Sequence, residues 1–268
     1  MTQTQHALDR SWTRTLLNKV PEVTVLFWIV KIMSTTVGET AADFLSSNLG
    51  LGLPATTAIM SLLLALVLVA QFSVRRYVPS VYWLAVVLIS VVGTLFSDNL
   101  VDNLGVSLWT TTVVFAAGLA VSFFVWYCWE HTLSIHTIVT RRREAFYWLA
   151  ILFTFALGTS AGDLIAEKLA VGYLPSAGLF GAVIAVIAVT HYRFGLNAVL
   201  AFWAAYILTR PFGASMGDFL TASHRVGGLG LGTNGTSALF LAVIVACVGY
   251  FTVAEKRDDR ELEPVLVS

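Results

Sequence analysis

Four aspartates recur along this chain at a fixed spacing from a tryptophan and a glycine. Each aspartate lies 15 residues after the tryptophan and five after the glycine, and each tryptophan follows another aromatic residue. The aspartates are Asp43, Asp98, Asp163 and Asp218, the glycines are Gly38, Gly93, Gly158 and Gly213, and the aromatic pairs begin at Phe27, Tyr82, Tyr147 and Phe202. Carboxylate oxygens suit protons, Mg²⁺, Mn²⁺ and other oxygen-preferring ions. We therefore treat the four aspartates as candidate cation-binding or metal-binding residues.

Three of these aspartates have a second carboxylate one helical turn away. The additional acids are Glu39, Asp102 and Glu167, whereas the fourth repeat has Ala222 at the corresponding place. Like charges at this spacing repel each other on an isolated helix. The pairs therefore predict something positive nearby, which could be a bound cation, a shared proton or a basic side chain.

The first copy of the motif carries the longest polar stripe. Lys31, Thr35, Glu39 and Asp43 follow one another in steps of four, so they share one face of a helix. A stripe of this length cannot face lipid and must line a cavity or pack against other polar helices. We predict that Glu39 joins the cation site and that Lys31 is a resident counter-ion of Glu39 or Asp43. The alternative is that Lys31 extends to the cytoplasmic surface.

The elements that carry these residues are predicted to be membrane-spanning helices. Of the 268 residues, 57% are hydrophobic and only 12% are charged, about half the charged share of an ordinary soluble domain. Several apolar stretches reach the roughly 20 residues needed to cross a bilayer. We predict an all-α integral membrane protein with spans near 22–45, 53–74, 78–100, 106–128, 145–167, 174–193, 196–220 and 236–254.

Basic residues divide unequally between alternate loops. Twelve lie on the side of the two termini and only Lys168 and Arg225 on the other side. The larger group is Arg10, Arg14, Lys19, Arg75, Arg76, Arg141, Arg142, Arg143, Arg193, Lys256, Arg257 and Arg260. The positive-inside rule then predicts that both termini are cytoplasmic. The expected organisation is a cytoplasmic segment (1–21), one transmembrane domain (22–254) and a cytoplasmic tail (255–268).

The motif defines four tandem two-helix repeats, near 22–74, 78–128, 145–193 and 196–254. Because each repeat contributes two spans, all motif helices run the same way and should be related by an axis along the membrane normal. Each glycine has a small residue four positions later, a spacing that lets helices approach closely in lipid. We therefore interpret the glycines as helix-packing residues and the tryptophans as interfacial anchors.

The fourth copy departs from this pattern. Arg210-Pro211 precedes Gly213, and a proline inside a helix removes a hydrogen bond and is expected to kink or break the span. Freed carbonyls in a broken span are a known way to build an ion site in the middle of the membrane.

The segment from Lys31 to Asp43, followed by three weaker copies, resembles a bacterial family of membrane proteins built from four tandem repeats of unknown function. The likeness extends from about Val20 to Ala254. It implies the architecture of eight helices and a bacterial cytoplasmic membrane location, but no activity.

The leading functional hypothesis is a transporter or exporter of a small cation that uses axial carboxylates. One alternative is a structural or sensory protein whose aspartates only cap helices. Another is an intramembrane aspartyl enzyme, suggested by Gly162-Asp163 and Gly217-Asp218, although Ser160 and Ser215 stand where such enzymes have a further glycine. Cys128 and Cys247 lack metal-ligand spacing. Besides lipid and a small cation we expect no cofactor, no catalytic residue and, with a net charge of zero, no nucleic-acid partner; the oligomeric state stays open.

Overall fold

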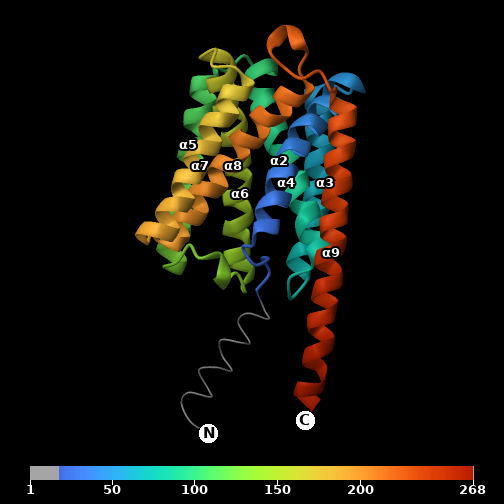
Figure 1. Cartoon of the computed structure of the whole chain (residues 1–268), viewed down its shortest axis with the longest axis vertical. Coiled ribbons are helices and arrows are strands. Elements are labelled where there is room, and N and C mark those ends of the chain that lie inside the picture. Colours follow the sequence, from blue (N-terminus) through green and yellow to red (C-terminus); the bar gives the residue numbers. More distant parts are fainter. Residues whose placement is uncertain (1–17, 268) are drawn as a thin grey trace.

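The computed structural model describes residues 18–267, with side chains for residues 18–254, and every regular element in that part of the chain is helical (Figure 1). Most of the expected N-terminal segment (1–21) and the side chains of the expected tail lie outside the described residues. The long helices are α2 (Val25–Asp43), α3 (Leu53–Ser73), α4 (Pro79–Asp98), α5 (Leu108–Glu130), α6 (Arg141–Asp163), α7 (Tyr173–Phe194), α8 (Ala198–Thr221) and α9 (Thr233–Val267). They agree closely with the predicted spans, except that α9 continues as a helix to Val267 and extends past the other helices (Figure 1).

Seven of the described helices are long and apolar enough to cross a membrane by length and composition. α8 is not among them, since Arg210, Pro211 and Asp218 reduce its apolar character. The structure also shows that α8 runs unbroken through Pro211. The expectation of a broken span is therefore wrong.

Side-chain caps set the start of several helices. Thr24 Oγ1 accepts a hydrogen bond from Phe27 N at α2, and Thr140 is the corresponding cap of α6. Asn197 Oδ1 accepts from two main-chain N–H groups at α8. These caps satisfy N–H groups that have no partner within the helix.

The four motif helices form a closed inner ring. α2 contacts α4, α4 contacts α6, α6 contacts α8, and α8 contacts α2. The other four pack outside, each against the inner helix of the following repeat: α3 on α4, α5 on α6, α7 on α8 and α9 on α2. Most of α2, α4 and α6 is buried, whereas the outer helices are largely exposed. Repeat four thus closes onto repeat one, which gives a cyclic arrangement of four equivalent units.

The first three inner helices end in the same way. A π-helical turn follows directly after Asp43, Asp98 and Asp163, at residues 44–48, 99–103 and 164–168. Two residues after each turn the backbone adopts a positive φ, at Gly50, Gly105 and Ala170, the conformation that favours glycine. This turn changes the phase of the helix at the site of the carboxylate pairs, and π-helical turns are frequent at functional sites.

Candidate functional site

One cavity of about 390 Å³ lies where the inner helices end, and all four motif aspartates line it. The remaining carboxylates of its wall are Glu39, Asp102 and Glu167. Asp43, Asp102 and Glu167 are exposed, so the cavity opens to the surface, while Asp98, Asp163 and Asp218 are half-buried. Seven carboxylates therefore meet in one space, and none of the described residues that line it is basic. Such a cleft concentrates cations by its electrostatic potential.

The aspartates do not cap helices in the described structure. Asp43, Asp98 and Asp163 each precede a π-helical turn without a side-chain hydrogen bond to its N–H groups. The helix-capping alternative is therefore wrong at these three positions. Within the described residues, no group of three or more histidine, cysteine or acidic side chains is arranged to hold a metal ion. The cavity is an acidic vestibule lined by seven carboxyl groups.

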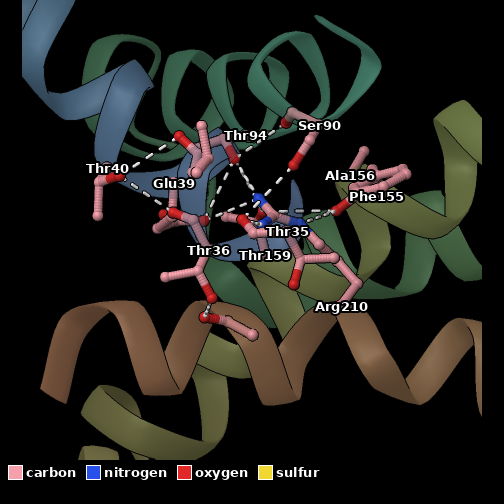
Figure 2. A network of polar contacts seen from close by, with 12 residues as sticks. Thr35, Thr36, Glu39, Thr40, Ser90, Thr94, Phe155, Ala156, Thr159 and Arg210 are labelled. Atoms are coloured by element: carbon pink, nitrogen blue, oxygen red, sulfur yellow. Dashed lines mark hydrogen bonds and ion pairs between the residues drawn. The ribbon is translucent and has the colours of Figure 1, made fainter. Parts of the chain in front are cut away.

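The floor of the cavity is the Glu39 carboxylate, which forms an ion pair with Arg210, a residue that does not itself line the cavity. Glu39 Oε2 accepts a hydrogen bond from Arg210 Nη2 at 2.8 Å, and the Arg210 side chain is fully buried. Arg210 Nη2 also donates to Thr159 Oγ1 at 2.7 Å and to Thr94 Oγ1. Figure 2 shows these side chains converging from all four inner helices. Arg210 is thus a basic partner for Glu39, while the other two acid pairs have no basic partner in the described lining of the cavity.

Lys31 is not the counter-ion that the polar stripe predicted. It does not line the cavity, and Glu39 is paired with Arg210 instead. Its Nζ lies 4.0 Å from the ring centroid of Phe155 and 4.3 Å from that of Tyr206, without a hydrogen-bond partner among the described residues. The polar stripe does face the interior, because Lys31, Thr35 and Glu39 are all buried.

The four motif glycines of the inner ring of helices, the ring glycines, lie where each inner helix crosses the next one. A Cβ atom on Gly38 would collide with Ser90 of α4, and one on Gly93 would lie 2.7 Å from Phe155 Cβ of α6. A Cβ on Gly158 would collide with Arg210 of α8, and one on Gly213 with Thr35 of α2. The four contacted residues stand three positions before the next glycine. The crossings thus repeat around the ring.

The aromatic pairs form a second cyclic layer near the beginning of the inner helices. The first aromatic residue of each repeat packs against the tryptophan of the next, with ring centroids 5.4 to 6.1 Å apart. Trp83, Trp148 and Trp203 are at most 4% exposed. The interpretation of the tryptophans as interfacial anchors is therefore wrong for these three, because a buried ring cannot contact the membrane interface.

The sequence pattern underestimated three contributors to the site. Arg210, Thr94 and Thr159 all lie outside the repeated Trp, Gly and Asp motif. Both threonines directly follow a ring glycine, as Glu39 follows Gly38. Superposing the four repeats at the glycine would have identified this layer.

A family model described as "Repeat of Unknown Function (DUF347)" matches the chain four times, at residues 26–77, 81–132, 146–196 and 201–257. The four matches confirm the predicted repeats and the resemblance to a family of four-repeat proteins. No curated protein and no solved structure was found to match the chain.

Proposed function

The chain belongs to the DUF347 repeat family, and we propose that it is a membrane transporter or exporter of a small cation, either the proton or an oxygen-preferring divalent metal. The observation that carries the proposal is the cavity lined by seven carboxylates and, among the described lining residues, by no basic side chain. Such a surface is costly to maintain unless it serves a positive ligand. Carboxylate oxygens favour hard ions such as Mg²⁺ and Mn²⁺.

The proposal places all eight helices across the bilayer, with the repeats related by an axis along the membrane normal. α8 can be included although it is more polar, because Arg210 is buried inside the ring and paired with Glu39, so that its charge avoids lipid. The distribution of basic loop residues supports cytoplasmic termini. The family resemblance supports the bacterial cytoplasmic membrane.

This arrangement supports access from one side in the conformation described. The cavity opens at the ends of the inner helices, Glu39 forms its floor and pairs with Arg210 behind it, and the aromatic layer fills the ring beyond this pair. A cation that crosses must pass the floor, so transport requires a change in the packing of the inner helices. The chemistry of the proposal is binding and release, with no catalytic residue and no cofactor.

The test is cation flux into liposomes that contain the purified protein and an enclosed Mn²⁺-sensitive or pH-sensitive dye. We expect Asp43→Asn and Asp163→Asn to reduce the flux by roughly tenfold or more, since each removes charge that concentrates the ion. Glu130→Gln is the matched control, because Glu130 does not line the cavity and instead pairs with Arg142 and Arg143. Equal flux from the wild-type protein and both aspartate variants, for either ion, would contradict the proposal.

A further inference from the structure

The guanidinium group of Arg210 is surrounded by oxygen atoms from the three other inner helices (Figure 2). Nη1 donates to the main-chain oxygen of Thr35 at 2.6 Å, and Nε donates to that of Phe155 at 3.4 Å. Nη2 donates to Glu39 Oε2, Thr159 Oγ1 and Thr94 Oγ1. Five oxygens, one of them from a carboxylate, thus surround one positive group.

The repeats explain how this arrangement arises. Glu39, Thr94 and Thr159 occupy the same position, directly after the ring glycine, in repeats one to three. The corresponding residue of repeat four is Ala214, which has no polar side chain. Arg210 extends from one turn earlier on α8 into this layer. Three repeats therefore supply oxygen atoms, and the fourth supplies a cation.

We propose that these oxygens form a second cation-binding site, deeper on the axis than the cavity, and that Arg210 occupies it as a tethered cation in the conformation described. This inference rests on the proposed function, in which a cation reaches the cavity above. One carboxylate, two hydroxyls and two main-chain carbonyls are ligands typical of hard metal cations. The site takes such an ion when the guanidinium moves away.

The Arg210 guanidinium and a metal cation cannot occupy this site together, because both are positively charged. Glu39 is almost fully buried, and a buried charge needs a partner, so Arg210 neutralises it whenever no ion is bound. A metal ion among the same oxygens would repel the guanidinium at close range. The Lys31 side chain lies close to the same group, because its Nζ and the Arg210 Cζ both lie over the Phe155 ring, at 4.0 and 5.5 Å. Arg210 is therefore held in place by its five oxygen contacts and by the Phe155 ring.

The experiment counts the ions bound at saturation by the purified full-length protein in detergent, with Mn²⁺ and Na⁺ as separate probes. We expect Arg210→Gln to bind one ion more per chain than the wild-type protein for at least one probe. Arg210→Lys keeps a tethered charge and should bind no additional ion. The double variant E39Q/R210Q loses the carboxylate as well and should also bind no additional ion.

The outcomes separate this inference from the proposed function. The wild-type count tests the cavity, whereas the difference between Arg210→Gln and wild type tests the deeper site. No additional ion of either kind in a folded Arg210→Gln variant would overturn the inference. Recovery of a folded Arg210→Gln variant only when Mn²⁺ or Na⁺ is present would support it. Failure of that variant to fold at every ion concentration, whether or not E39Q/R210Q folds, would overturn it.

Discussion

Glu39 Oε2 lies 2.8 Å from Nη2 of Arg210, although the two residues are 171 positions apart in the chain. The pair joins the first inner helix to the last and so closes the ring. Both side chains are at most 8% exposed. Removal of one partner therefore leaves the other charge buried without compensation.

This burial predicts strong coupling between the two residues. Glu39→Gln or Arg210→Gln alone should lower the free energy of unfolding by about 3–5 kcal/mol, the usual cost of an unpaired buried charge. The double variant should lose less than the sum of the single losses, because neither charge is then left alone. Denaturant unfolding of the purified protein in detergent, measured without added divalent ions, would check this. Additive losses would show that the residues do not stabilise each other.

The glycine crossings predict a position-dependent effect of one methyl group. Gly93→Ala places a Cβ 2.7 Å from Phe155 Cβ and 3.0 Å from the main-chain nitrogen of Ala156, so overpacking should lower stability by about 1–3 kcal/mol. Gly178→Ala on α7 is the control, because nothing lies within 4 Å of its new methyl group. That variant should be neutral or more stable by about 0.5–1 kcal/mol, since alanine favours helix. Thermal unfolding of both variants measures these changes in stability. Similar losses of stability in the two variants would contradict the crossing geometry.

A second buried ion pair lies near the other end of the molecule. Lys19 Nζ is 2.6 Å from Glu144 Oε2, and Gln71 Nε2 donates to Glu144 Oε1 at 3.1 Å. Glu144→Gln should lower stability by about 3–5 kcal/mol because Lys19 is left buried without its partner. Arg142→Gln should cost about 1 kcal/mol or less, since Arg142 is 57% exposed. A loss from Arg142→Gln as large as that from Glu144→Gln would contradict this ranking.

Because the four aspartates share one cavity, each of them should contribute to the binding of the same ion. Asp98→Asn should weaken Mn²⁺ binding by about tenfold, or ~1.4 kcal/mol, because one charge of the vestibule is lost. The difference should shrink at high salt, which screens charges that face water. Isothermal titration at two ionic strengths measures both effects. Equal Mn²⁺ affinity of wild type and Asp98→Asn at low salt would show that Asp98 is outside the binding field.

The distribution of basic loops predicts the orientation of the chain in the membrane. With Cys128 and Cys247 replaced by serine, a cysteine at Lys168 should react with a membrane-impermeant maleimide in intact cells. A cysteine at Arg142 should react only after the cells are opened, because Arg142 lies on the side that the positive-inside rule predicts to be cytoplasmic. Labelling of both positions in intact cells would contradict the predicted topology.

Much of the fold could be read from local patterns. The predicted spans near 53–74 and 78–100 correspond to α3 at Leu53–Ser73 and α4 at Pro79–Asp98, because length and apolar composition act within a single segment. The π-helical turns were not predicted. They depend on how the end of each inner helix packs against its neighbours, and no local signal marks them.

The sequence pattern located the Trp, Gly and Asp of each repeat but did not reveal the surroundings of all of them. The spacing of Trp83, Gly93 and Asp98 identified the repeat, yet it did not show that Trp83 is buried by neighbouring rings. An aromatic residue near the start of a span suits both the membrane interface and a packed layer between helices. Only the neighbouring helices distinguish these two environments.

By itself, the sequence determined the positions of the helices, the number of repeats and the presence of one equivalent aspartate in each repeat. Each of these follows from the spacing of residues along the chain. Only the tertiary structure decided that the inner helices close into a ring, which brings Asp43, Asp98, Asp163 and Asp218 into one cavity. It also decided that Arg210, rather than Lys31, is the partner of Glu39. Both bases lie on inner helices, and the choice between them depends on their depth along the axis. That depth is set by the helix crossings at the ring glycines, and these crossings join residues too far apart in the chain for a sequence pattern to relate.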